Sequence, residues 1–205
     1  MAVDKTPIVK QSRREGYALH PKAVKIMARK TGIPGQHANG RRGKPSLYNT
    51  QLREKQKVRR IYGLLEKQFA RLMNEAERKE GLSGENLLVL LERRLDNVVY
   101  RAGFATSRRQ ARQLATHGSF LLNGKRVDIP SIRLKVGDEL EVREKSKKNG
   151  YFANIAEISR DAMTQPQPWI KADAKKMTIK IVALPTRENA EADINEQLIV
   201  EYYSR

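Results

Sequence analysis

The 205-residue sequence contains no cysteine and only three histidines. Without cysteine the chain can form no disulfide, no thiolate metal site and no cysteine nucleophile. The histidines, His20, His37 and His117, lie too far apart in the sequence to indicate a zinc site built from histidine. We therefore expect the protein to bind no metal and no other cofactor.

Long apolar runs are also missing. No stretch approaches the roughly 20 apolar residues that a membrane-spanning helix needs, and the N-terminus lacks the apolar core of a signal peptide. We therefore expect a cytoplasmic protein with no membrane partner. The chain is long enough for one large domain or two small ones, each with a hydrophobic core.

Acidic residues are scarce relative to basic ones, 23 against 41, which gives a net charge of +18. The excess lies in two blocks, because residues 1–60 hold 16 basic and 3 acidic side chains and residues 101–150 hold 12 and 5. Residues 61–100 and 151–205 are close to neutral, at −1 each. Two basic blocks indicate two surfaces that contact a polyanion. An anionic membrane is the alternative, but neither block predicts a basic helix with a bulky apolar face, so the pattern favours nucleic acid.

Catalytic motifs are lacking as well. Gly35–Gly40 has the glycine spacing of a phosphate loop, but Arg41-Arg42 stands where Lys-Ser/Thr is required and no strand is expected before it. Asp96 stands in an Arg-Leu-Asp triplet, the catalytic signature of a pseudouridine synthase family. Asn97-Val98-Val99 replaces the Gly and Thr or Ser expected after the aspartate. We interpret Asp96 as a helix residue that pairs with an arginine, and we expect no enzyme; an RNA-modifying enzyme is the alternative.

The most informative stretch runs from Ser107 to Arg126. Ser107 is a favourable N-cap residue, and Gly118 stands where a helix end needs a residue that tolerates positive φ. After a β-type run, Asn123-Gly124 predicts a two-residue hairpin turn. A compact helix–hairpin unit of this kind brings two groups of cations together, namely Arg108, Arg109, Arg112, Lys125 and Arg126.

The remaining segments predict a basic arm and several helices and strands. Residues 1–48 are rich in proline and glycine and poor in large apolar residues, so we expect an arm that orders against RNA, or else a disordered basic tail. Residues 51–73 and 83–100 have the apolar spacing of helices. The cations on the first of these helices repel one another, and an anionic partner would relieve that repulsion. The later segments predict strands over 127–143, 178–184 and 198–203 and a short helix over 152–163.

Several motifs together resemble one known family, the bacterial small-subunit (30S) ribosomal protein four, or S-four, family. The helix–hairpin stretch matches the RNA-binding module named after it. The other matching motifs are, in order, Ser12-Arg-Arg-Glu-Gly16, Pro34-Gly-Gln-His37, Leu52–Gly63, Glu92–Arg101 and Asp193–Glu201.

The resemblance implies a structural component of the small ribosomal subunit that binds 16S ribosomal RNA. Members of the family nucleate assembly of the 30S body and contribute to translational accuracy. It also implies contacts with ribosomal protein five, with other small-subunit proteins and with messenger RNA where it enters the subunit, and no small-molecule substrate. Many relatives hold zinc through four cysteines in the N-terminal arm; this chain has none, so we expect the metal-free type.

The resulting prediction is an α+β protein in three parts. Residues 1–48 form an extended basic arm, residues 49–93 and 151–205 form a discontinuous helical domain, and residues 94–150 form an inserted S-four-type RNA-binding module. We expect the arginines and lysines to neutralise RNA phosphates, and we expect charge reversal at Arg108 and Arg112 to abolish binding without harming the fold. A free-standing RNA chaperone is a further alternative. The candidate RNA-binding residues are Arg13, Arg14, Arg41, Arg42, Lys44, Arg53, Lys55, Lys57, Arg59, Arg60, Ser107, Arg108, Arg109, Arg112, His117, Asn123, Lys125 and Arg126.

Overall fold

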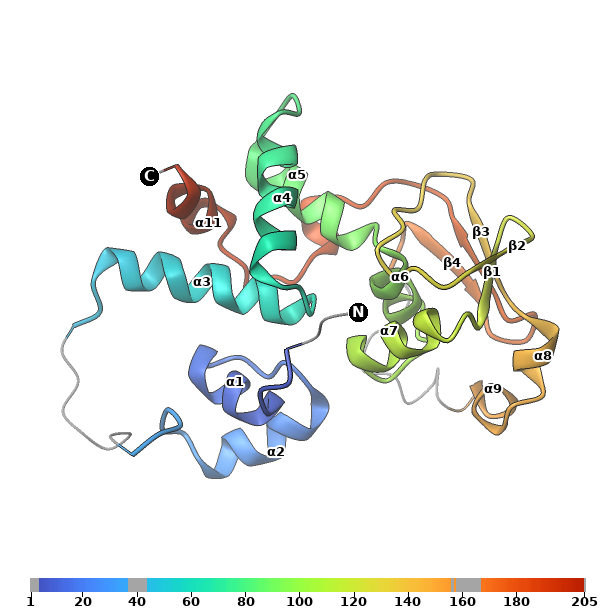
Figure 1. The fold of residues 1–205 in the computed structure, drawn as a ribbon, viewed down its shortest axis with the longest axis horizontal. Helices are drawn as coiled ribbons and strands as arrows, with labels where there is room; N and C mark the ends of the chain where they lie inside the picture. Colours follow the sequence, from blue (N-terminus) through green and yellow to red (C-terminus); the bar gives the residue numbers. More distant parts are fainter. Residues whose placement is uncertain (1–3, 37–43, 156, 158–166, 205) are drawn as a thin grey trace. The chain divides into compact units, whose positions relative to one another are not determined.

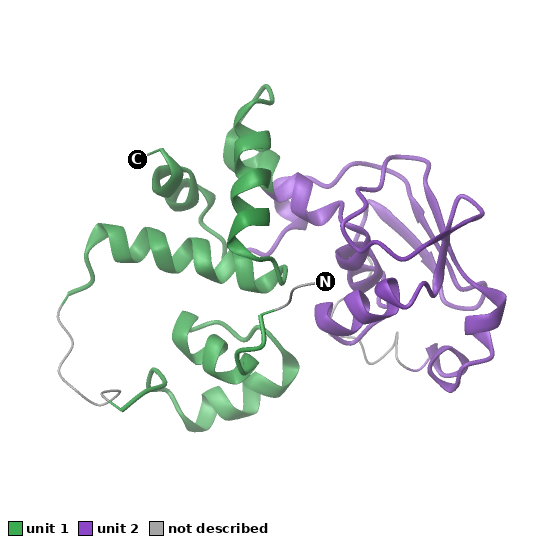
Figure 2. Ribbon diagram, viewed as in Figure 1, with its two compact units in different colours: residues 1–87, 193–205 green, residues 88–192 purple. Residues whose placement is uncertain are grey.

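The computed structural model describes residues 4–36, 44–155, 157 and 167–204, and the chain divides into two compact units (Figures 1 and 2). Unit 1 comprises residues 1–87 and 193–205, and unit 2 comprises residues 88–192. Unit 1 is helical in its described part, whereas unit 2 combines helices with a sheet. The α+β class predicted from the sequence is therefore confirmed. None of the described helices has the length and apolar character needed to span a bilayer.

Unit 1 is built from helices that meet around a core which includes Val58, Phe69 and Met73. The C-terminal helix returns to this unit and packs along α3. In chain order the helices are α1 (Ile8–Glu15), α2 (Pro21–Arg29), α3 (Leu47–Ile61), α4 (Glu66–Glu77), the first half of α5 (Ser83–Glu92) and α11 (Glu196–Tyr203).

The N-terminal segment is not the irregular arm that its composition predicts, because it contains α1 and α2. Pro7 precedes α1, and Pro21 is the first residue of α2. Proline is well tolerated at a helix start, where its missing N–H would have no partner within the helix. These prolines therefore begin helices rather than prevent them.

The two long helices predicted from the apolar spacing are each interrupted. Gly63 adopts the left-handed conformation (φ 63°), so α3 ends at Ile61 and α4 starts at Glu66. The second predicted helix, over residues 83–100, is broken between α5 and α6 (Leu95–Arg101), where Arg94 forms a β-bridge with Arg133. In both places the apolar spacing continues across the break, which is why periodicity alone misses it.

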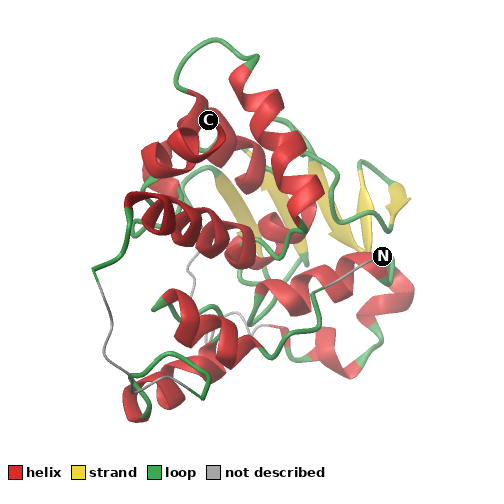
Figure 3. Cartoon of the chain, turned by 60° about the vertical axis from the view of Figure 1, so that its left-hand side comes forward, coloured by secondary structure: helices red, strands yellow, loops and turns green. Residues whose placement is uncertain are grey.

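Unit 2 contains an antiparallel sheet of five strands among its described residues, in the order β2-β1-β3-β5-β4 (strands yellow in Figure 3). Its core joins helix residues such as Val98 and Ala111 to sheet residues such as Leu140 and Ile179. The strands are β1 (Phe120–Leu122), β2 (Lys125–Val127), β3 (Glu139–Val142), β4 (Ile170–Asp173) and β5 (Thr178–Ile181). The other elements are α6, α7 (Arg108–Thr116), α8 (Glu144–Lys147), α9 (Gly150–Ala153) and the short 3-10 helix η1 (Arg187–Asn189).

The helix–hairpin prediction is confirmed in detail. Ser107 caps α7 by accepting a hydrogen bond from the backbone N–H of Gln110 at 3.3 Å. Gly118 has φ 65°, and the turn residues Asn123 and Gly124 have φ 49° and 79°. Leu122 pairs with Lys125 across this two-residue turn.

The observed units differ from the predicted three-part division. β5 pairs with β3 of the module, and β4 extends the same sheet, so residues 151–192 belong to unit 2 rather than to a helical domain. Ile179 and Ile181 are buried in this sheet, which holds the segment there. Only residues 193–205 return to unit 1, and the strand predicted over 198–203 is wrong because α11 is a helix. Of the helix predicted over 152–163, residues 156 and 158–163 lie outside the described part of the chain.

Candidate nucleic-acid interface

Arg108 and Arg112, the leading candidates on α7, are held by partners within unit 2. Arg108 donates from Nε to Asn97 Oδ1 (2.9 Å) and from Nη2 to Glu191 Oε1 (2.7 Å), and its guanidinium lies 4.5 Å from the centre of the Tyr100 ring. Arg112 Nη1 lies 3.5 Å from Asp96 Oδ2, and burial lowers the pKa of the Arg112 guanidinium. Both side chains stabilise the unit.

Asp96 is buried, and its carboxylate lies 3.2 Å from Arg94 Nε as well as near Arg112. The interpretation that Asp96 pairs with an arginine is confirmed. Charge reversal at Arg112 would place a carboxylate beside Asp96, and reversal at Arg108 would place one beside Glu191. We therefore expect these reversals to destabilise the fold, in contrast to the expectation from the sequence.

The fully buried carboxylate of Glu92 organises the helix pair α6–α7. It accepts hydrogen bonds from Arg101 Nε at 3.0 Å, Arg101 Nη2 at 2.8 Å and Asn97 Nδ2 at 2.7 Å. Asn97 in turn accepts, through its Oδ1, a hydrogen bond from Nε of Arg108. This buried network fixes α7 in position while the opposite face of that helix stays open to solvent.

The exposed cations of the helix–hairpin are Arg109, Lys125 and Arg126. The Arg126 guanidinium lies against Gly118 at the end of α7, so that a Cβ at Gly118 would be 2.8 Å from its Nε. His117, also exposed, is the neighbouring C-cap residue. The fold thus brings Arg126 to the C-terminal end of α7, while Arg109 occupies the first turn of that helix.

Two other candidates in this unit have structural contacts. Ser107 is buried and caps α7. Asn123 donates from Nδ2 to Asp138 Oδ1 and accepts from the Glu139 N–H, both at 2.9 Å, which ties the hairpin turn to the start of β3.

The cations of α3 are neutralised mainly by groups within the chain. Lys55 is buried, and its Nζ lies 2.7 Å from Glu66 Oε1 and 4.4 Å from the centre of the Tyr202 ring. Lys57 donates to the Asp193 carbonyl at 2.6 Å. Arg59 donates to the Leu64 carbonyl and to Gln56 Oε1. Lys57 also pairs with Glu54 at 2.9 Å, so the carboxylates of Glu54 and Glu66 relieve part of the repulsion on this helix from inside the protein. Lys55 is too buried to reach a phosphate.

Arg53 and Arg60, the other two candidates on α3, both bind Glu15 at the end of α1. Their side chains keep 30% and 18% of their surface exposed, whereas the Glu15 side chain has none exposed. These two arginines therefore combine a buried partner with an accessible edge.

The N-terminal candidates fall into three groups. Arg13 is bound to the Gly32 carbonyl through Nε and Nη2, at 3.0 and 2.7 Å, whereas Arg14 and Lys44 are exposed. Arg41 and Arg42 lie outside the described residues. Four exposed cations absent from the candidate set belong to α2 or directly follow it: Lys22, Lys25, Arg29 and Lys30. Their helical spacing is the signal that could have identified them, once α2 was recognised as a helix.

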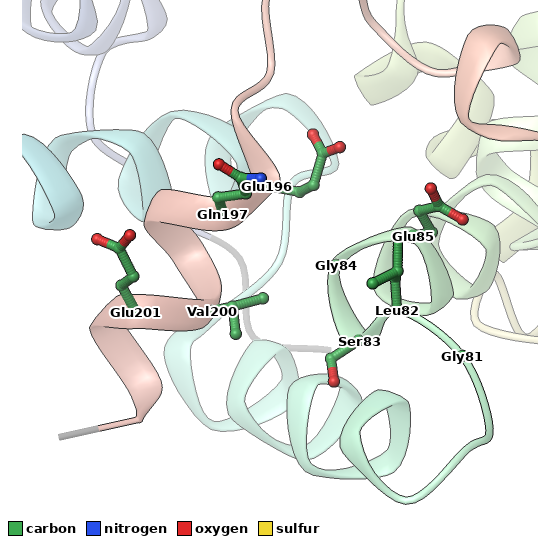
Figure 4. A pocket seen from close by; sticks show the side chains of 9 residues that line it. All are labelled: Gly81, Leu82, Ser83, Gly84, Glu85, Glu196, Gln197, Val200 and Glu201. Atoms are coloured by element: carbon green, nitrogen blue, oxygen red, sulfur yellow. The ribbon is translucent and has the colours of Figure 1, made fainter.

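In unit 1, a pocket of about 420 Å³ is lined by acidic side chains and by no basic ones (Figure 4). It lies between the start of α5 and α11, which come so close that a Cβ on Gly84 would be 2.7 Å from Cγ of Glu196. Its lining is Gly81, Leu82, Ser83, Gly84, Glu85, Glu196, Gln197, Val200 and Glu201. Three carboxylates disfavour a phosphate here, so we leave this surface out of the candidate nucleic-acid interface.

A preformed helix–hairpin with exposed cations, no acidic residue in the first turn of its helix, and a buried network beneath it defines an RNA-binding module. Comparison with known families agrees with this class. Residues 93–140 match the S4 domain, and residues 4–92 match the ribosomal protein S4/S9 N-terminal domain.

Relatives match the chain over nearly its whole length. It is 50% identical over 204 residues to small ribosomal subunit protein uS4 of Syntrophomonas wolfei, with 97% of each chain covered. It is 52% identical to the protein of that name from Clostridioides difficile, with 96% of each chain covered. It is 49% identical to the protein of that name from Chloroflexus aurantiacus, with 97% of each chain covered. The chain therefore belongs to the uS4 family of small ribosomal subunit proteins. This is a family of structural ribosomal proteins and not of enzymes, and its S4 domain indicates binding to ribosomal RNA.

Proposed function

We propose that this chain binds 16S ribosomal RNA directly, as an early structural component of the 30S subunit in the cytoplasm, and thereby contributes to translational accuracy. The observation that carries the proposal is the exposed set Arg109, Lys125 and Arg126 on a helix–hairpin in which Arg108 and Asn123 are held by partners within the unit. A surface that is ordered before binding loses little conformational entropy when RNA arrives, which suits a protein that binds early in assembly.

Recognition is electrostatic and geometric. Each lysine or arginine that neutralises a phosphate releases counterions, so affinity falls steeply as salt rises. Structured RNA presents its phosphates and 2′-hydroxyls in a fixed pattern, and a rigid set of cations reads that pattern without a base code. The exposed cations of α2 in unit 1 extend the contact to a second region of RNA.

The proposal includes protein partners. The acidic pocket at Glu85, Glu196 and Glu201 repels phosphate but favours a basic side chain, and the nearby Leu82 side chain is 69% exposed. These features support contact with a neighbouring protein of the small subunit, and ribosomal protein five is the partner that we propose. The basic surfaces support contact with messenger RNA where it enters the subunit.

Binding to isolated 16S RNA followed by co-sedimentation with small subunits tests the proposal. We expect the purified chain to bind the RNA without any other protein, and we expect chain incorporated during reconstitution to stay with small subunits in high salt. Large subunits serve as the control and should retain none. A protein that binds both subunits equally and washes off in high salt is a general RNA chaperone, and that result would contradict the proposal.

A further inference from the structure

Glu15 joins two arginines of α3 through a single oxygen. Arg53 and Arg60 are seven residues apart, about two helical turns, so they lie on one face of α3. Glu15 Oε1 accepts a hydrogen bond from Nη1 of Arg53 at 3.0 Å and another from Nη1 of Arg60. Glu15 is the last residue of α1, and the helix ends at Gly16 in the left-handed conformation, φ 67°.

The charges of this cluster do not cancel, and three of its polar atoms have no hydrogen-bond partner among the described residues. Two guanidinium groups share one carboxylate, and Arg14 and Arg59 also lie near Glu15. The cluster therefore keeps a net positive charge even though Asp4 lies near Arg59 and Arg60. Glu15 Oε2 and the Nε atoms of Arg53 and Arg60 are buried without a hydrogen-bond partner among the described residues. Burial also raises the pKa of the Glu15 carboxyl, although the nearby arginines act against this rise. Buried polar atoms are usually hydrogen-bonded, so a role in stability alone does not account for three unpaired atoms in one cluster.

The cluster has a closed side and an open side. The Glu15 side chain has no exposed surface, while Arg53 and Arg60 keep 30% and 18% of theirs. The Glu15 carboxylate is therefore covered, while part of each arginine side chain remains accessible to a ligand. Two guanidinium edges with a net positive charge match the oxygens of a phosphate, which arginine binds with paired hydrogen bonds.

We propose that Glu15 is a positioning residue that orients Arg53 and Arg60 to bind phosphates of the RNA backbone. The inference rests on the proposed function, because it assumes that the chain binds 16S RNA. In this arrangement the Glu15 carboxylate strengthens RNA binding although it does not itself contact RNA. Nonspecific electrostatics has the opposite consequence, since loss of an acidic group from a basic protein should raise its affinity for RNA.

Glu15→Gln in the full chain separates these two consequences. It keeps the shape of the side chain and one oxygen acceptor but removes the charge that holds the guanidinium groups. We expect affinity for a 16S RNA fragment to fall about tenfold or more, the loss that follows from misplacing a charge-assisted hydrogen bond. The slope of log affinity against log salt should become shallower by about one to two, because one or two phosphate contacts are lost.

Two further variants make the test specific. Glu54→Gln removes an acidic group as well, but this one lies on α3 and pairs with Lys57, so the affinity of the variant for RNA should stay the same or rise. In a chain that already carries Arg53→Gln and Arg60→Gln, adding Glu15→Gln should cause no further loss of affinity. A purely structural role for Glu15 would lower affinity in that background as well, and circular dichroism checks that each variant is folded.

Two results would overturn the inference. One is unchanged or higher affinity of Glu15→Gln, and the other is a further loss in the double-arginine background. If the unmodified chain does not bind 16S RNA at all, the proposed function fails first. If it binds and Glu15→Gln binds equally well, only the role of Glu15 is refuted.

Discussion

Single buried carboxylates hold the basic helices of this protein in place. In unit 2, Glu92 is fully buried and binds both Arg101 and Asn97, and Asn97 then binds Arg108. A buried ion pair contributes little net stability over an apolar pair, but removal of one partner leaves an uncompensated charge. Such a residue has a large effect when it is changed, although it touches no ligand.

Glu92→Ala is expected to lower the free energy of unfolding by about 3 kcal/mol, because the buried Arg101 and Asn97 side chains lose their shared acceptor and Arg101 keeps only the more distant Glu191, at 3.4 Å. Urea unfolding followed by circular dichroism measures the change. Glu144→Ala is the control, since Glu144 forms a solvent-exposed pair with Lys147 and should cost at most about 1 kcal/mol. Equal losses in the two variants would show that burial does not set the cost.

The residue type alone does not reveal which cations are available to RNA. Arg108 and Arg109 are adjacent in the sequence, yet one is bound to Glu191 and the other is exposed. The partner of Arg108 lies 83 residues further along the chain, so local pattern cannot identify it. The basic character of the interface is therefore readable from the sequence, whereas its division into bound and exposed cations depends on tertiary contacts.

The helix–hairpin of unit 2 depends on two glycines with different surroundings. Gly124 (φ 79°) has nothing within 4 Å of an added Cβ, whereas Gly118 (φ 65°) is covered by the Arg126 guanidinium. Both positions need the left-handed conformation, which costs other residues about 1–2 kcal/mol. Only at Gly118 would a side chain also move a cation.

We expect Gly124→Ala and Gly118→Ala to lower stability by a similar amount, about 1 kcal/mol each. Only Gly118→Ala should weaken RNA binding, because its Cβ displaces Arg126. Thermal unfolding and RNA titration of both variants at the same salt concentration test this. A loss of affinity in Gly124→Ala as large as in Gly118→Ala would mean that Arg126 is not a contact.

Elements defined by local chemistry are the ones the sequence predicts well. The Ser107 cap and the Asn123-Gly124 turn depend on the conformations of a few neighbouring residues. By contrast, β5 is placed by its pairing with β3, and α11 is held where Ile199 is buried in unit 1. Short apolar runs are compatible with either a strand or a helix, and long-range pairing decides between them. This explains why the domain boundary was predicted too early in the chain.

At the scale of the whole molecule, the net charge of +18 attracts the chain to RNA, and the fold selects the cations that remain available. Many basic side chains on α3 and α7 are bound to carboxylates and carbonyl groups within their own unit. We propose that a small set of exposed cations contacts the RNA phosphates. In unit 2 these cations are Arg109, Lys125 and Arg126.

The most direct test compares two triple variants that remove the same charge from unit 2. One changes Arg109, Lys125 and Arg126 to Gln, and the other changes Lys171, Lys175 and Lys176, which are also exposed, to Gln. The measurement is the affinity for a 16S RNA fragment across a salt series. We expect the slope of log affinity against log salt to become shallower by about two to three for the first variant, while the second keeps the slope of the unmodified chain. Equal slopes for the two variants would contradict this expectation.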